Sequence, residues 1–189
     1  MDTSKLLFHG TGIYALAAIA ESNTLSEGIH WQKPGEPRGP RTSQCFDIAS
    51  GFITYNVHWG EGGVLVLDRE ALARDYDLVE YRDSCYTGEL MSDEREIAII
   101  TSAVKNLDKY IVSIVCDPAI VPLALDEENV QAAIQECGWA FESEGEEGIN
   151  EAKAAFAALL CHPKFNAWIP ESGFPHHGNW EMRKKSPSP

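Results

Sequence analysis

The chain has 189 residues, of which 44% are hydrophobic, 10% aromatic and 23% charged, so wholesale disorder is excluded and a folded globular domain is expected. Its formal net charge is −14, from 15 basic and 29 acidic residues. An acidic surface repels phosphate groups, which argues against non-specific nucleic-acid binding. A basic protein partner, or mimicry of a nucleic acid, remains compatible with this charge.

Targeting signals and cross-linking patterns are not evident in the sequence. There is no apolar run of about 18 residues, and the first residues lack the apolar core and cleavage site of a signal peptide. We therefore expect no membrane partner and a cytoplasmic location, in its own cell or in a host cell. The five cysteines are widely spaced and are expected to be reduced and mostly buried. The neighbours of His176 fit no metal-ligand spacing, so no metal is expected.

The first part of the chain is predicted to contain a strand, a helix and a long loop. Residues 5–9 are predicted to form a short buried strand, and apolar residues at helical spacing predict a helix over 13–20. Residues 30–42 contain three prolines and two glycines and are predicted to form a loop without regular structure. A second helix is expected over 46–55.

The middle of the chain has strands with no regular alternation with helices. Strands are predicted at 64–68, 96–100 and 110–116, and a short helix at 69–75. The first of these strands is continuously apolar, as is typical of a strand buried on both faces. This pattern predicts an α+β fold and argues against a doubly wound nucleotide-binding sheet. No glycine-rich dinucleotide or phosphate-binding loop is present.

The last third of the chain is expected to be helical. Helices are predicted over 126–141 and 149–161, separated by an acidic turn at 142–147. We therefore predict a core over residues 1–122, a helical C-terminal region over 123–182 packed on that core, and a disordered tail over 183–189.

Three polar motifs occur in a fixed order: His-Gly-Thr at 9–11, Arg-Thr-Ser at 41–43, and Asp-Glu-Arg-Glu at 93–96. With their surroundings they resemble the ADP-ribosyltransferase superfamily, above all its small bacterial and phage-type members and its histidine-containing branch. The matching segments are LFHGT, RTSxxxxxAxxF, VLVLDREAL, EREIAI and NLDKYIVSI, which together span roughly residues 5–116. The resemblance implies an ADP-ribosyltransferase-like split sheet, in which NAD lies in a cleft between two small sheets.

The resemblance also implies roles for particular residues. His9 would contact the nicotinamide ribose and the backbone of Gly10 would pair with the carboxamide, with Thr11 and Ser43 beside them. Arg41 belongs to the basic cluster of the long loop and would engage the pyrophosphate, because phosphates bind cationic side chains. Two of these residues also have a simpler explanation without a role in NAD binding. His9 could be an ordinary core histidine, and Arg41 could serve only to keep the loop soluble.

An aromatic side chain and a carboxylate complete the implied site. Phe52 or Tyr55 would stack on the nicotinamide ring, although either could be a core residue. Glu96, or Glu94, would stabilise the positive charge that develops on the ribose when nicotinamide leaves. The two glutamates share one face of an extended segment, and Glu96 is favoured because it directly precedes the apolar strand.

The implied function is mono-ADP-ribosyl transfer. NAD would be the substrate, no metal would be required, and the acceptor would be a macromolecule, with protein favoured over nucleic acid. Two alternatives remain. One is an NAD-dependent RNA 2′-phosphotransferase, against which the net charge of −14 argues. The other is a non-enzymatic acidic binder or inhibitor, either a degenerate member of the fold or a nucleic-acid mimic.

Overall fold

The computed structural model describes residues 3–28, 37–44, 63–81, 96–116, 124–126, 128–131, 143 and 145–167. The strands in these ranges are β1 (Leu6–Thr11), β2 (Thr24–Ser26), β3 (Arg41–Ser43), β4 (Gly63–Asp68), β5 (Leu78–Tyr81), β6 (Glu96–Ile99), β7 (Ala103–Lys105), β8 (Ile111–Cys116) and β9 (Phe165–Ala167). The α-helices are α1 (Ile13–Ser22), α3 (Arg69–Asp75) and α6 (Gly145–Cys161), and the 3-10 helices are η1 (Thr3–Lys5) and η2 (Leu107–Lys109).

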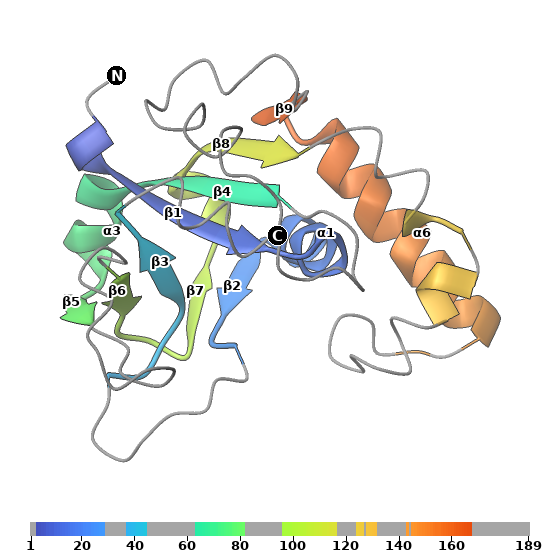
Figure 1. Ribbon diagram of the computed structural model, residues 1–189, viewed down its shortest axis with the longest axis horizontal. Helices are drawn as coiled ribbons and strands as arrows, with labels where there is room; N and C mark the ends of the chain where they lie inside the picture. The colour runs from blue at the N-terminus through green and yellow to red at the C-terminus, as the bar shows by residue number, and fades with distance from the viewer. Residues whose placement is uncertain are drawn as a thin grey trace, which may run out of the picture.

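One main sheet organises the described part of the chain. Seven strands follow the order β5-β6-β3-β1-β4-β8-β9, and β2 and β7 form a separate two-stranded ribbon. Every described pairing is antiparallel except that of β8 with β9. Figure 1 shows β1, β4 and β8 running side by side, with β3 and β6 on one side of them and α1 and α6 on the other. The predicted α+β class is confirmed.

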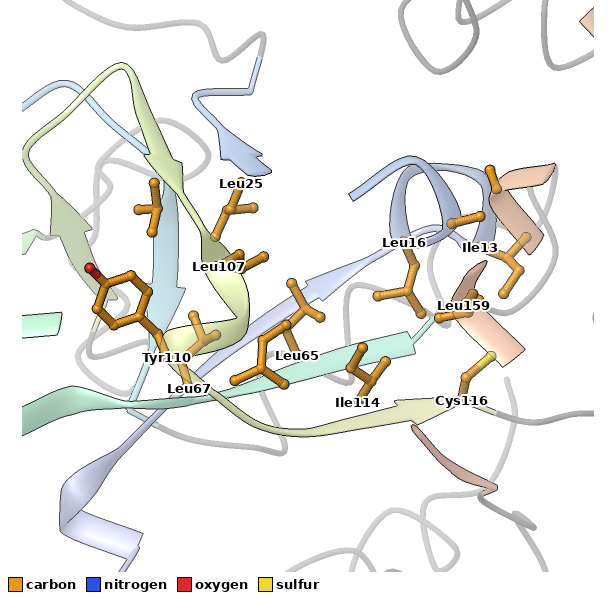
Figure 2. Packing of buried hydrophobic residues seen from close by; sticks show 14 of the residues in the cluster. Ile13, Leu16, Leu25, Leu65, Leu67, Leu107, Tyr110, Ile114, Cys116 and Leu159 are labelled. Atoms are coloured by element: carbon orange, nitrogen blue, oxygen red, sulfur yellow. The ribbon is translucent and has the colours of Figure 1, made fainter. Parts of the chain in front are cut away.

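The main core lies where α1 and α6 pack on the sheet. Ile13 and Leu16 of α1 and Leu159 of α6 lie beside Leu65 of β4 and Ile114 of β8 (Figure 2). Each of these side chains is at most 1% exposed. Removing this much apolar surface from water is the principal favourable term for the fold.

The close approach of α1 to β4 depends on a glycine. A Cβ added to Gly63 would overlap the side chain of Leu16 and would lie 2.7 Å from the carbonyl oxygen of Val115. The helix ends at Asn23, which adopts the left-handed conformation with φ of 50°. Asparagine tolerates this conformation better than most residues and often ends helices in this way.

The other face of the central strands carries a second apolar cluster. Its members come from β1, β4 and β8 and are Leu6, Phe8, Val64, Val66 and Val115. The same strands contribute alternate residues, such as Leu7 and Leu65, to the main core. The prediction that the apolar strand at 64–68 is buried on both faces is therefore confirmed.

The long elements of the sequence-based prediction are confirmed, with small shifts at their ends. These are the strands predicted at 5–9, 64–68, 96–100 and 110–116 and the helices predicted at 13–20, 69–75 and 149–161. The short strands β2, β5, β7 and β9 were not predicted, because three or four residues are too few to establish a period-2 pattern. Since β9 pairs with β8, the segment expected to be only helical also contributes a strand to the sheet.

Two local predictions are wrong. Arg41 and Thr42, assigned to an irregular loop, form β3 with Ser43 because they find partners on β6. Glu146 and Glu147, assigned to an acidic turn, lie in the first turn of α6. Negative side chains are favourable there because the amino end of a helix carries a partial positive charge.

Other predictions fall partly or wholly beyond the described ranges. The helix predicted at 46–55, most of that at 126–141 and the tail at 183–189 lie outside them. Cys116 is buried, as expected, whereas Cys161 is exposed. The other three cysteines lie outside the described residues. Among the described helices, none has the length and apolarity needed to span a membrane.

Candidate functional site

The described residues of the three motifs lie on adjacent strands of the main sheet. Strand β3 carries the Arg-Thr-Ser motif and lies between β1, which ends in His-Gly-Thr, and β6, which begins at Glu96. Phe8 of β1 is paired with Ser43 of β3, and Ser43 is paired with Glu96 of β6. Segments that are far apart in the sequence are therefore neighbours in the sheet.

The pairing of β1 with β3 is short. It consists of the single register pair Phe8–Ser43, whereas β1 pairs with β4 along its whole length, from Leu6 to Thr11. Beyond Phe8, the side of β1 that faces β3 has no further strand partner in the described register. The two strands thus separate at the His-Gly-Thr motif.

The side chain of His9 bridges the two strands where they separate. Its Nδ1 atom lies 2.7 Å from the backbone carbonyl oxygen of Arg41. A carbonyl oxygen can only accept a hydrogen bond, so Nδ1 must carry the proton that it donates. In the neutral ring, Nε2 is then left as a hydrogen-bond acceptor. A histidine held in this way can accept a hydrogen bond from a ligand hydroxyl.

Gly10 and Thr11 continue β1 opposite Val64 and Gly63 of β4, and both are partly buried. Helix α1 follows almost directly, with Gly12 as its N-cap and without a side-chain cap. The amino end of a helix favours negatively charged groups. This helix end is not among the predicted site residues. Gly12 can nevertheless be recognised in the sequence as the glycine between the His-Gly-Thr motif and the apolar helix.

The guanidinium group of Arg41 is hydrogen-bonded to the segment that precedes β3. Its Nη2 atom donates a hydrogen bond to the carbonyl oxygen of Pro37 at 2.9 Å, and the side chain is partly buried. A phosphate could replace Pro37 as an acceptor, because an anion accepts stronger hydrogen bonds than a neutral carbonyl. The backbone carbonyl of Arg41 therefore contacts His9, whereas its guanidinium group contacts Pro37.

Glu96 lies at the start of β6 and is partly buried. Residues that are directly opposite in neighbouring strands share a face of the sheet, so Glu96, Ser43 and Phe8 are on one face. His9 follows Phe8 and starts from the other face, where its β4 partner Leu65 is fully buried. His9 therefore lies beside the backbone of Arg41, whereas the pleat places the side chains of His9 and Glu96 on opposite faces of the sheet.

Strand β3 is fixed by contacts that the sequence analysis did not identify. The hydroxyl of Thr42 donates to the carbonyl oxygen of Ile97 at 3.0 Å, and Thr42 is only 3% exposed. Just before the strand, Gly39 has a φ of 141°, and a Cβ added to it would overlap the carbonyl oxygen of Ile99. The backbone of Pro40 also accepts a hydrogen bond from Ile99 at 3.0 Å. These contacts set the register that places Ser43 opposite Glu96.

The end of β3 is also connected to α3. Arg69 donates from Nη1 to the side-chain oxygen of Gln44 at 3.2 Å. The preceding residue, Asp68, caps α3 by accepting a hydrogen bond from the amide of Ala71 at 2.8 Å. Both ends of this three-residue strand are thus held by polar contacts.

Three predicted site residues, Glu94, Phe52 and Tyr55, lie outside the described residues. Within the described ranges, no group of three or more His, Cys, Asp or Glu side chains is arranged to hold a metal ion. Comparison with known proteins finds no match, either among family models, among curated proteins or among solved structures.

Proposed function

We propose that this protein is a mono-ADP-ribosyltransferase that uses NAD to modify a macromolecule and releases nicotinamide. The observation that carries this proposal is the adjacency of β1, β3 and β6, which brings three polar motifs from distant parts of the chain onto neighbouring strands. Strand pairing of purely structural origin would not require His-Gly-Thr, Arg-Thr-Ser and Glu96 on those strands. The resemblance of these motifs to ADP-ribosyltransferases supports the same reaction and an ADP-ribosyltransferase-like fold.

In this proposal the nicotinamide half of NAD binds where β1 and β3 separate. The Nε2 atom of His9 accepts a hydrogen bond from a ribose hydroxyl, and the backbone of Gly10 pairs with the carboxamide. Glycine suits this role because no Cβ keeps the ligand away from the backbone. Thr11 and Ser43 lie on the same two strands, and Phe52 or Tyr55 provides the stacking surface.

The reaction breaks the bond between nicotinamide N1 and ribose C1′. Nicotinamide leaves as a neutral molecule, and C1′ forms a new bond to a nucleophilic atom of the acceptor, which loses its proton. Positive charge develops on the ribose as the first bond lengthens, and a nearby carboxylate stabilises it. Glu96 is the described candidate, and Glu94, two residues earlier in the sequence, is the alternative.

The opposite faces of His9 and Glu96 restrict how NAD can bind. β3 alone separates β1 from β6, so the two backbones are roughly 10 Å apart. This separation is comparable with the size of a nicotinamide riboside, so one ligand can contact both strands. We propose that the ribose enters at the split, with the His9 ring on one side and the carboxylate on the other.

The charge of the chain bears on the acceptor and on an alternative function. A net charge of −14 favours a basic or neutral protein as the acceptor over a nucleic acid. The same charge favours, as a second candidate, a non-enzymatic acidic binder that occupies a cationic site on its partner. Only the enzymatic proposal requires NAD to bind at His9.

Two labels on NAD test the proposal directly. The protein is incubated with a cell lysate and NAD labelled in its adenylate half, and separately with NAD labelled in nicotinamide. Transfer of the adenylate label to a macromolecule, together with release of the nicotinamide label as a small molecule, is the expected result. Absence of both NAD binding and nicotinamide release would refute the proposal and leave the acidic binder as the better explanation.

A further inference from the structure

The described part of the sheet ends at β5, on the side away from β9 and α6 (Figure 1). Among the described strands β5 pairs only with β6, and the pairing is regular along its whole length. It extends one residue further, because the amide of Ile100 donates to the carbonyl oxygen of Asp77 at 2.9 Å. In an antiparallel pair, alternate residues direct their backbone N–H and C=O groups away from the partner strand. Such outward groups can pair with another extended chain.

Two exposed apolar side chains lie on one face of this edge. Val79 of β5 and Ile100, which follows β6, are 39% and 38% exposed, and they are two of the three large apolar residues that are exposed in the described ranges. Val79 is paired with Ala98, so Ile100 is its diagonal neighbour across the two strands and lies on the same face. An apolar side chain placed over both would remove this surface from water.

The same face carries the carboxylate of the proposed reaction. Glu96 precedes Ala98 by two residues, and alternate residues of a strand share a face. The two positions are roughly 7 Å apart along β6. A chain bound to the outer side of β5 would thus lie close to Glu96. The side chain of Glu80 belongs to the other face, because its partner Ile97 is part of the main core.

The charge of this segment indicates the kind of partner. Residues 75–81 include three acidic residues and no basic one. Asp77 is exposed and shares the face of Val79. A second copy of this chain would bring the same acidic residues to the edge, and like charges disfavour such pairing. A basic segment of another protein would instead be attracted.

We propose that β5 is the docking strand for the acceptor protein, which adds an extended basic segment to this edge of the sheet. An apolar residue of the segment covers Val79 and Ile100, and a basic residue two positions away lies opposite Asp77. Backbone hydrogen bonds provide affinity in this mode of binding, and the spacing of the two side chains provides specificity. The inference rests on the proposed function, because it takes the docked protein to be the acceptor of ADP-ribose.

Two peptides of identical composition test the spacing. In repeats of Thr-Val-Thr-Lys, valine and lysine lie on one face of an extended chain, whereas in repeats of Thr-Thr-Val-Lys they lie on opposite faces. Amide chemical shifts of the protein are followed as each peptide is added. We expect the first peptide to bind with a Kd of roughly 1 mM and to shift the signals of Leu78 and Val79, and the second to bind about tenfold more weakly. Equal affinities, or shifts confined to other strands, would overturn the proposal.

A matched pair of variants tests the surface itself. Val79→Lys places a positive charge on the docking face. Leu160→Lys makes the same change at the third exposed apolar residue, which lies on α6 at the other end of the sheet. We expect Val79→Lys to lower the affinity for the first peptide, and the transfer of label from NAD to lysate proteins, at least about tenfold, with NAD affinity unchanged. Leu160→Lys should behave as the wild type. Equal losses in both variants would mean that overall charge governs binding, which would refute a docking strand.

The docking strand and the proposed function can fail separately. If nicotinamide is released and label transfer is undiminished in Val79→Lys, docking at β5 is wrong while the proposed function stands. If the wild type binds the first peptide at β5 but neither binds NAD nor releases nicotinamide, the edge binds basic segments and the enzymatic proposal is wrong. Self-association that Val79→Lys abolishes would identify a second copy as the occupant and overturn the inference. If Val79→Lys does not fold, Ile100→Lys replaces it, and the peptide comparison requires no variant.

Discussion

The imidazole of His9 is bonded to the backbone of Arg41, 32 residues later, through a 2.7 Å contact between Nδ1 and the carbonyl oxygen. This contact occurs one residue beyond the point at which β1 and β3 cease to pair. It therefore does two things: it connects the strands across their split and it selects the tautomer with an unprotonated Nε2. The hydrogen bond to Arg41 thus determines both the orientation of the ring and its tautomer.

Two substitutions of His9 separate its structural role from its proposed binding role. His9→Asn keeps a side-chain N–H that can donate to the Arg41 carbonyl but removes the ring and its Nε2 acceptor. We expect this variant to unfold at nearly the wild-type denaturant concentration, while its affinity for NAD falls about tenfold, as for the loss of one hydrogen bond.

His9→Ala removes the donor as well, leaving a partly buried carbonyl oxygen without this partner. The free energy of unfolding should fall by about 1–2 kcal/mol in addition to the loss of NAD affinity. Urea unfolding and calorimetric titration with NAD measure the two effects. If His9→Asn binds NAD as tightly as the wild type, His9 serves only to join the strands.

We expect that substitution of Gly39 destabilises the segment that precedes β3. Gly39→Ala would strain a backbone with φ of 141° and would force a Cβ into the carbonyl oxygen of Ile99. We expect destabilisation of about 2–4 kcal/mol. The matched control is Gly12→Ala, because Gly12 has a φ of −64° and nothing within 4 Å of an added Cβ.

The control should change the free energy of unfolding by less than about 1 kcal/mol. Thermal and urea unfolding of both variants provide the comparison. Equal small effects at the two positions would mean that the segment before β3 is not held against Ile99 as described.

The long, buried elements were predictable from the sequence, whereas the short strands were not. Residues 64–68 were predictable as a strand because four consecutive apolar residues, 64–67, are typical of a strand that is buried on both faces. The helix at 13–20 was predictable because apolar residues recur with helical period at positions 13, 16, 17 and 20. In the structure its first five residues, 13–17, are all buried.

Strand β3 could not be predicted, because its residues carry no such pattern. Arg41, Thr42 and Ser43 are polar and follow three prolines, which is the composition of a loop. They form a strand because distant residues provide partners, including the Ile97 carbonyl oxygen for the Thr42 hydroxyl. The face of each side chain likewise follows from a register that only the folded chain defines.

Alkaline pH should destabilise the protein through Tyr14. Burial, and secondarily the negative charge of Asp126, raises the pKa of Tyr14 from 10.0 to about 12. A raised pKa means that the fold favours the protonated phenol, whose hydroxyl donates to the Ala124 carbonyl oxygen at 3.1 Å. The contribution of Tyr14 to stability is therefore complete below about pH 10 and is lost as the pH rises towards about 12.

Tyr14→Phe cannot ionise and provides the comparison. Below about pH 10 it should be less stable than the wild type by about 1 kcal/mol, for the lost hydrogen bond. The difference should shrink and then reverse as the pH rises, because only the wild type loses stability through this group. Urea unfolding of both proteins across this pH range measures the difference, in which the titration of all other groups cancels. A difference that does not vary with pH would mean that Tyr14 ionises as readily in the fold as in the unfolded chain.

Glu96→Gln separates the proposed enzyme from a binding protein. The substitution removes a negative charge while nearly preserving shape. If Glu96 stabilises positive charge on the ribose, the interaction exists mainly in the transition state, so kcat should fall at least about a hundredfold while KM for NAD changes little. Glu80→Gln is the matched control, since Glu80 is an exposed glutamate on the neighbouring strand β5, opposite Ile97.

The rate of nicotinamide release and the melting temperature should be measured for both variants and for Glu94→Gln. Glu80→Gln should retain wild-type turnover. Glu80→Gln and Glu96→Gln should melt within a few degrees of the wild type, because Glu80 is exposed and Glu96 is only partly buried. If Glu94→Gln loses turnover and Glu96→Gln does not, the catalytic carboxylate is the earlier of the two. If both retain full turnover, neither glutamate stabilises the ribose cation, and the chemistry must come from elsewhere on the sheet.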